Sequence, residues 1–273
     1  MPETNETLKG EVRAFWDKSS CGEIYAQGEE PRSYYESHAR TRYALEPVIP
    51  LFARFGEARD KDVLEIGVGM GADHIELAKA GPRGLTGVDL TPRAIEHVTR
   101  RLQVYGLNSR LQVADAEHLP FADESFDFVY SWGVLHHSPD TPQAIREVWR
   151  ILRPGGKTRV MIYHKYSLVG YMLWLRYALM RGRPGRSLAE IYAQHLESPG
   201  TKAYSMAEAR RMFGQFSQVE MRAELGFGDL LEGGVGQRHR GPLLSLAKRL
   251  WPRWFFKRFM KGHGLGLLVE AVK

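Results

Sequence analysis

The sequence has very little cysteine and no long apolar run, and both absences restrict what the protein can be. Cys21 is the single cysteine among 273 residues, which excludes a disulfide scaffold and a zinc cluster built from cysteines. No apolar run reaches about 18 residues, so an ordinary transmembrane helix is not expected. The first residues are polar and acidic, unlike a signal peptide. These features favour a cytoplasmic protein.

Acidic residues are absent from one C-terminal stretch. Eight Lys or Arg and no Asp or Glu lie between Arg238 and Lys261. The whole chain has a net charge of +6, so the other residues together carry a charge of −2. The basic character therefore belongs to one segment. Because the rest of the chain offers no basic face, a nucleic-acid partner is not expected.

Strands and helices are expected to alternate from Lys61 onward. Short apolar segments at 63–66, 85–88, 111–113, 126–130 and 158–163 predict five strands. Thr-Pro pairs at 91–92 and 141–142 are typical helix starts, with the threonine as cap. Such alternation predicts an α/β fold with a doubly wound, mostly parallel sheet. Strand-like segments at 218–225 and 266–272 would bring the sheet to seven strands.

Two motifs follow the first two predicted strands. Glu65-Ile-Gly67-Val-Gly69-Met-Gly71 is a glycine loop whose backbone can approach a ligand closely. Asp89 ends the second strand, 22 residues after Gly67, where a carboxylate can accept hydrogen bonds from a ribose diol. These motifs suit a nicotinamide or an adenosyl cofactor equally well. Three further motifs lie at 114–121, 126–137 and 152–156.

The five motifs, in this order, resemble those of the class I S-adenosylmethionine-dependent methyltransferases. The resemblance covers roughly Asp62–Tyr163 and is greatest to the branch with the ubiquinone/menaquinone and sterol methyltransferases. Glu65 distinguishes the pattern from nicotinamide enzymes, whose first strand rarely ends in an acid. The resemblance implies a Rossmann-like fold and S-adenosyl-L-methionine as the cofactor. It implies cofactor contacts for Glu65, Gly67, Gly69, Gly71, Asp89, Leu90, Asp115, Ala116, Ser131 and Trp132.

Candidate catalytic residues are His136, His137, Tyr163 and His164, at predicted strand ends on the cofactor side. The resemblance places His136 near the transferred methyl group. A general base is needed only if the acceptor must lose a proton. We expect no metal, because adjacent histidines point apart and the sequence shows no further ligand set.

The chain is expected to have four regions, of which the resemblance implies the lid. These are an N-terminal helical lid (1–60), the cofactor-binding core (61–163), a helical cap (164–215), and final strands (216–273) with a basic aromatic insertion (226–262). In the lid, Tyr25, Tyr34, Tyr35 and His38 are the predicted substrate contacts. A surface helix whose tyrosines dock on the domain is the alternative. If the lid interpretation holds, Tyr34→Ala should weaken turnover far more than cofactor binding.

Two apolar segments, 168–181 and 243–260, are rich in aromatic residues and are accompanied by Lys and Arg. They are expected to cap a hydrophobic pocket, to lie in a membrane interface at the inner face of a membrane, or to bind a protein partner. The first two readings favour a lipophilic or amphiphilic acceptor, methylated on carbon or oxygen. The alternatives are a nucleic-acid or protein methyltransferase, an NAD(P)-dependent oxidoreductase, and an inactive binding module. Association into a homo-oligomer stays open.

Overall fold

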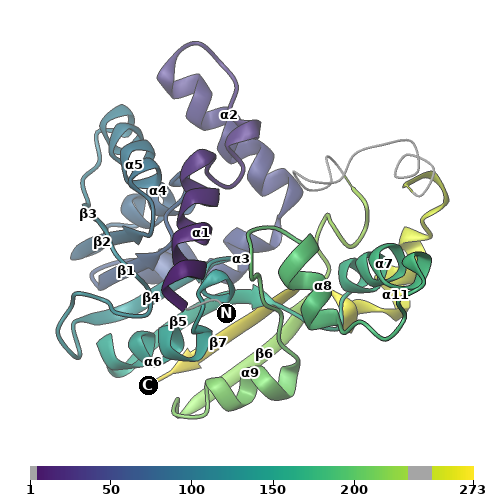
Figure 1. The fold of residues 1–273 in the computed structure, drawn as a ribbon. Helices are drawn as coiled ribbons and strands as arrows, with labels where there is room; N and C mark the ends of the chain where they lie inside the picture. Colours follow the sequence, from purple (N-terminus) through teal and green to yellow (C-terminus); the bar gives the residue numbers. More distant parts are fainter. Residues whose placement is uncertain (1–4, 233–247) are drawn as a thin grey trace.

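A seven-stranded mixed sheet runs through the protein, with helices on both faces (Figure 1). The computed structural model describes residues 5–232 and 248–273. The strand order is β3-β2-β1-β4-β5-β7-β6. The strands are β1 (Asp62–Ile66), β2 (Gly84–Asp89), β3 (Arg110–Val113), β4 (Phe126–Trp132), β5 (Leu152–Tyr163), β6 (Gln218–Glu224) and β7 (Gly266–Val272).

The sheet confirms the doubly wound, mostly parallel arrangement. Strands β1 to β5 pair in parallel, and β7 runs antiparallel between β5 and β6. The chain moves outward from β1 in one direction through β2 and β3, and then returns to the other side of β1 with β4. At such a reversal the loops after the two central strands separate, which opens a crevice at their carboxyl ends.

The helices fall into a layer on each face of the sheet and two outlying groups (Figure 1). Helices α4 (Ala72–Lys79) and α5 (Pro92–Tyr105) lie on one face, and α6 (Thr141–Ile151) and α9 (Met206–Met212) on the other. The N-terminal group is α1 (Asn5–Lys18), α2 (Pro31–Leu45) and α3 (Val48–Ala53). The C-terminal group is α7 (Leu168–Tyr177), α8 (Leu188–His195) and α11 (Arg253–Phe259). Five short 3-10 turns lie at Glu23–Tyr25, Phe55–Ala58, Leu135–His137, Leu179–Arg181 and Lys261–His263.

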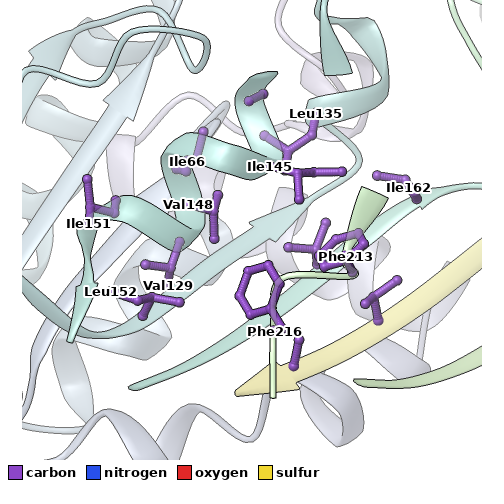
Figure 2. Packing of buried hydrophobic residues seen from close by; sticks show 14 of the residues in the cluster. Ile66, Val129, Leu135, Ile145, Val148, Ile151, Leu152, Ile162, Phe213 and Phe216 are labelled. Carbon is purple, nitrogen blue, oxygen red and sulfur yellow. The ribbon is translucent and has the colours of Figure 1, made fainter. Parts of the chain in front are cut away.

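Alternate residues of the strands pack into two separate cores, because successive side chains of a strand point to opposite faces of the sheet. Ile66 and Val129 point to the face covered by α6, whose Ile145 and Val148 pack against them (Figure 2). Phe213 and Phe216, at and beyond the end of α9, extend the same cluster. The neighbouring strand residues point instead to α3 and α4. The sheet is therefore enclosed on both faces, and its carboxyl edge is left for a ligand.

The helix starts agree with the sequence except at one cap. The Thr91 side chain accepts from the Ala94 amide at the start of α5, as predicted. The prediction that Thr141 caps α6 is wrong, because the Asp140 side chain accepts from Gln143 there. Thr141 Oγ1 instead donates to the Leu135 carbonyl at 3.0 Å. The carboxylate is the stronger acceptor, and the start of α6 thereby becomes tied to the Leu135–His137 turn.

The structure adds detail to three further expectations. The N-terminal region, predicted as a helical lid, contains helices of 14 residues in α1 and 15 in α2. Residues 154–156, which precede the predicted fifth strand at 158–163, lie inside β5, where the register with β4 shifts. The predicted segment 243–260 lies partly outside the described residues, and only 248–260 can be placed. No helix in the described ranges combines the length and the apolar character needed to cross a bilayer.

Candidate functional site

A cavity of about 430 Å³ lies at the carboxyl ends of the central strands. Most residues predicted from the sequence reach its wall. They are Tyr25, His38, Glu65, Gly67, Gly69, Gly71, Asp89, Leu90, Asp115, Ala116, Trp132, His137 and Tyr163. The structure thus gathers the predicted cofactor loops and part of the predicted acceptor end in one space.

The glycine loop needs its glycines for two different reasons. All three have positive φ, with 82° at Gly67, 48° at Gly69 and 74° at Gly71. A Cβ at Gly67 would overlap the side chain of Val134, so this position sets the close packing of the β1 and β4 loops. A Cβ at Gly69 would meet no atom within 4 Å, although Gly69 lines the cavity. The space beside Gly69 is therefore available to a ligand that approaches the backbone.

Asp89 joins the two loops that follow β1 and β2. Its Oδ2 accepts from the Gly69 amide at 3.1 Å, and its Oδ1 accepts from the Thr91 amide at 3.0 Å and from Thr91 Oγ1 at 2.9 Å. Burial raises the pKa of Asp89, and these donors oppose that shift. A carboxylate has about four acceptor sites, so Oδ2 retains capacity for a ligand hydroxyl. This geometry fits the predicted ribose contact.

Glu65 belongs to a buried chain of hydrogen bonds with His74 and Ser109. Burial, with the nearby Asp73 charge, raises the pKa of Glu65 well above its usual range. Burial also lowers the pKa of His74 to about 3. Glu65 Oε2 lies 2.8 Å from His74 Nδ1, and His74 Nε2 lies 2.8 Å from Ser109 Oγ. The protonated carboxyl can donate to Nδ1 while Nε2–H donates to the hydroxyl, which satisfies the whole chain without an ion.

Helix α1 lies against the cavity and is anchored by one lysine that the sequence did not single out. Lys9 Nζ lies 2.6 Å from Asp115 Oδ2 and 2.9 Å from Glu117 Oε2. Burial opposes the ammonium charge, but the two carboxylates raise the pKa of Lys9. Trp16, on the same helix, packs edge-on against His137 with ring centroids 5.2 Å apart. Helix α1 therefore forms the wall that the sequence assigned to the tyrosines of α2.

The structure does not bring five predicted residues to the cavity wall. Tyr34 and Tyr35 face α5, where the Tyr35 hydroxyl donates to the His97 carbonyl at 3.1 Å. Ser131 Oγ donates to the Ile66 carbonyl at 2.9 Å. His164 is buried beside the Gly264 carbonyl, 3.3 Å from Nδ1. His136 is fully enclosed behind the wall. The hydrogen bonds of Tyr35, Ser131 and His164 join neighbouring elements, and none of the five residues lines the cavity.

A polar group built from three segments occupies the other end of the cavity. The Tyr163 hydroxyl donates to Glu197 Oε2 at 2.8 Å, and His137 Nε2 lies 3.4 Å from the same oxygen. Burial and the Glu197 charge raise the pKa of Tyr163 well above its usual range, so its hydroxyl stays a donor. Glu197 lies after α8 in a stretch without any motif, and sequence reasoning missed it. Only the tertiary fold brings it to β5.

Most of the surrounding wall is apolar. The side chains come from α1, the following turn, α2, α3, β7 and the loops after α8 and before β7. They are Val12, Phe15, Trp16, Ile24, Leu45, Val48, Leu196, Phe227, Leu265 and Leu268. Such a lining favours a largely apolar ligand and limits the entry of water.

A buried ion pair forms the floor below α2. Asp73 Oδ2 accepts from Arg42 Nη2 at 2.8 Å and from the Tyr130 hydroxyl at 3.0 Å, while Oδ1 accepts from the Tyr43 hydroxyl at 2.9 Å. Burial alone would raise the pKa of Asp73, but Arg42 and the hydroxyl donors hold it below its ordinary value. The pair links α2, α4 and β4 at the base of the cavity.

The similarity to known proteins falls in the part of the chain that contains the glycine loop and Asp89. A family model described as a methyltransferase domain matches residues 64–160. The chain is 34% identical over 163 residues to 27-O-demethylrifamycin SV methyltransferase of Amycolatopsis mediterranei, covering 57% of each chain. It is 41% identical over 97 residues to phthiotriol/phenolphthiotriol dimycocerosates methyltransferase of Mycobacterium leprae, covering 35% of each chain. The matches thus span about half, or less, of these relatives.

Solved structures support the fold. The YcgJ protein of Bacillus subtilis superposes with a TM-score of 0.54 and 21% identity, covering 84% of this chain and 98% of its own. An S-adenosylmethionine-dependent methyltransferase from Mesorhizobium loti gives a TM-score of 0.51 and 16% identity, covering 83% and 97%. At these identities the likeness concerns the architecture of the sheet and its helices.

Proposed function

We propose that the chain is a class I S-adenosylmethionine-dependent methyltransferase that transfers the methyl group to a small lipophilic or amphiphilic acceptor. The methyltransferase domain matched at residues 64–160, the 34% identical rifamycin methyltransferase and the shared fold support this proposal. The observation that carries this proposal is a continuous cavity that has the glycine loop and Asp89 at one end and a largely apolar wall at the other. The name of one relative refers to an O-demethylrifamycin, which supports methylation on oxygen, and the name of another refers to dimycocerosates, which supports a lipophilic acceptor.

The residues present fit the cofactor. The open space beside Gly69 admits a ligand, and Asp89 keeps an acceptor site for a ribose hydroxyl. Asp115 and Ala116 would lie along the adenine, and Trp132 beside the methionine end. When bound, S-adenosylmethionine supplies an electrophilic methyl group on a sulfonium. The protein's part is to position the acceptor and to exclude water, for which α1 supplies Phe15 and Trp16.

The polar end of the acceptor would lie against His137, Tyr163 and Glu197, which line the cavity opposite the glycine loop. Tyr163 donates to Glu197, whose side chain is 34% exposed and can accept a hydroxyl hydrogen from the acceptor. His136 and His164, which do not line the cavity, would act by supporting this wall. An oxygen acceptor suits these groups better than a carbon acceptor, since they recognise a hydroxyl directly.

Cofactor binding is the first test. S-Adenosylmethionine and its product S-adenosylhomocysteine should each raise the melting temperature, because a ligand at 100 times its Kd stabilises by about 2.7 kcal/mol. NAD and NADP should leave the melting temperature unchanged. Formation of S-adenosylhomocysteine would then be measured with hydroxylated amphiphiles as acceptors. Stabilisation by NAD(P) alone would identify an oxidoreductase and overturn the proposal.

We further propose that one surface associates peripherally with anionic membranes. This aromatic face consists of exposed apolar residues from the ends of α7 and around α11: Leu175, Leu179, Met180, Leu250, Trp254, Phe255 and Phe259. The Tyr171 hydroxyl lies 2.9 Å from His263 Nδ1, which joins α7 to the turn after α11 (Figure 1). Cations flank the face at Arg181, Arg183, Arg253, Lys257 and Arg258. Exposed aromatics among cations suit the interface of an anionic bilayer.

Sedimentation with vesicles tests this surface. The protein should sediment with vesicles containing phosphatidylglycerol at low salt, less at high salt, and not with pure phosphatidylcholine. Trp254→Ser should weaken binding, because Trp254 is 74% exposed on the aromatic face. Leu51→Ser is the matched control, since Leu51 is also 74% exposed but lies on α3. Equal loss in both variants, or sedimentation that salt does not change, would contradict membrane association through this face.

A further inference from the structure

Two imidazoles and one carboxylate come together behind the acceptor end of the cavity. One ligand atom from each of His136, His137 and Glu197 lies within 4.8 Å of the others. His136 is fully buried, yet neither of its ring nitrogens has a hydrogen-bond partner in the part of the chain that the structure describes. An unsatisfied buried polar atom costs about 1–3 kcal/mol, so such an atom requires an explanation.

The sequence argument against a metal at these histidines fails on two points. Adjacent side chains point apart in an extended strand, but His136 and His137 lie in the Leu135–His137 3-10 turn, with ring centroids 4.3 Å apart. The third group, Glu197, is supplied by the loop after α8 and is 60 residues from His137 in sequence. Sequence spacing could not show it.

The surrounding hydrogen bonds orient the two ligands at the cavity. His137 Nδ1 lies 2.8 Å from Ser198 Oγ and 3.2 Å from Thr201 Oγ1, so Nε2 is turned toward Glu197. The Tyr163 hydroxyl donates to Glu197 Oε2 and fixes the carboxylate. Metal-binding histidines almost always use the second ring nitrogen in this way, and ligating carboxylates are themselves hydrogen-bonded.

We propose that His136, His137 and Glu197 bind one divalent transition-metal ion of the Zn²⁺, Fe²⁺ or Co²⁺ class. Two imidazoles and a carboxylate are a ligand set that these ions prefer, with at least one position left open. His137 and Glu197 line the cavity, so the open position faces it. There the ion would take an oxygen of the acceptor, a use that rests on the proposed methyl transfer. Binding of the ion itself does not depend on that function.

The other cluster of this kind lacks these features. Asp115, Glu117 and His118 also bring ligand atoms within 4.8 Å. Lys9 already pairs with both carboxylates, and the His118 side chain is 76% exposed. A metal ion there would compete with the Lys9 ammonium group. His118→Ala is therefore the matched control for removal of a histidine.

Calorimetric titration of chelator-stripped full-length protein with Zn²⁺ tests the site. We expect one ion per chain, with affinity at least about tenfold weaker in Glu197→Gln and in His136→Phe, and unchanged in His118→Ala. His136→Phe keeps a ring against Tyr163, and Glu197→Gln keeps an acceptor for the Tyr163 hydroxyl. If His136→Phe does not fold, the affinity of Glu197→Gln for Zn²⁺ decides whether the site exists. Co²⁺ should give visible ligand-field absorption that Zn²⁺ displaces.

The outcomes distinguish failure of the metal-site proposal from failure of the proposed methyl transfer. No binding by the wild type, equal affinity in the wild type and Glu197→Gln, or a loss in His118→Ala would each overturn the metal site. S-Adenosylmethionine binding, measured on the same stripped protein, should persist without metal, because none of the three ligands lies on the glycine loop. A protein that binds Zn²⁺ but not S-adenosylmethionine would keep the metal site and refute the proposed function.

Discussion

Replacement of Asp73 by alanine is expected to lower the free energy of unfolding by about 3–5 kcal/mol. The side chain is buried and accepts from Arg42, Tyr43 and Tyr130 at 2.8 to 3.0 Å. Its removal leaves the Arg42 guanidinium without its main counter-charge in a largely dry site. Urea denaturation of wild type and variant measures the difference directly.

Glu76→Ala is the matched control, because it removes a carboxylate from the same helix. Glu76 pairs with Lys79 at 2.8 Å, but both side chains are more than a third exposed. Exposed pairs contribute about 0–1 kcal/mol, so this variant should stay close to the wild type. Comparable losses in the two variants would show that α4, rather than the buried pair, governs the result.

The pKa of Asp73 predicts how the free energy of unfolding depends on pH. Arg42 and the hydroxyl donors, against the opposing effect of burial, hold the folded pKa of Asp73 below its ordinary value of 3.8. The contribution of Asp73 to the free energy of unfolding is therefore complete above this ordinary value and is lost as the pH falls through the folded pKa. Glu65 acts in the opposite sense, since burial raises its folded pKa, and its contribution declines as the pH rises above its ordinary value of 4.5. Asp73→Ala should lack the first slope and keep only the part of the second that burial of Glu65 causes.

The cofactor end of the site could be predicted from sequence because its information is local. Gly67, Gly69 and Asp89 follow directly from short strands, and strands of one parallel sheet end at one edge. Once five strands alternate with helices, these loops must meet. The Thr91 cap and the Ser205–Glu208 capping box are equally local, and both are present.

Lys9 and Glu197 could not be predicted, because they meet their partners only through tertiary packing. Lys9 pairs with Asp115, which is more than 100 positions away in sequence. Glu197, which follows α8, accepts from the hydroxyl of Tyr163, which precedes that helix in sequence. Neither belongs to a periodic pattern or motif. Tyr34 and Tyr35 failed as predicted contacts for the converse reason. The aromatic composition predicted a lid, but it did not show which face of α2 would turn toward α5.

Asp89→Ala is expected to reduce the affinity for S-adenosylmethionine by about 100-fold or more, since each hydrogen bond to a charged group contributes about 1.5–3 kcal/mol. The substitution removes the acceptor proposed for the ribose. It also removes the carboxylate that fixes the amides of Gly69 and Thr91, so the glycine loop loses its bound-state geometry. Calorimetric titration with S-adenosylhomocysteine measures the change without turnover.

Asp127→Asn separates this effect from a general loss of acidic residues. Asp127 lies near the amino end of β4, paired with Arg83 and Arg153 at 2.8 Å, at the opposite edge of the sheet. Its substitution should leave the affinity unchanged. If Asp89→Ala binds as tightly as Asp127→Asn, the carboxylate that ends β2 does not hold the donor. The cavity would then have to orient the cofactor through the glycine loop and Trp132, with the ribose directed away from β2.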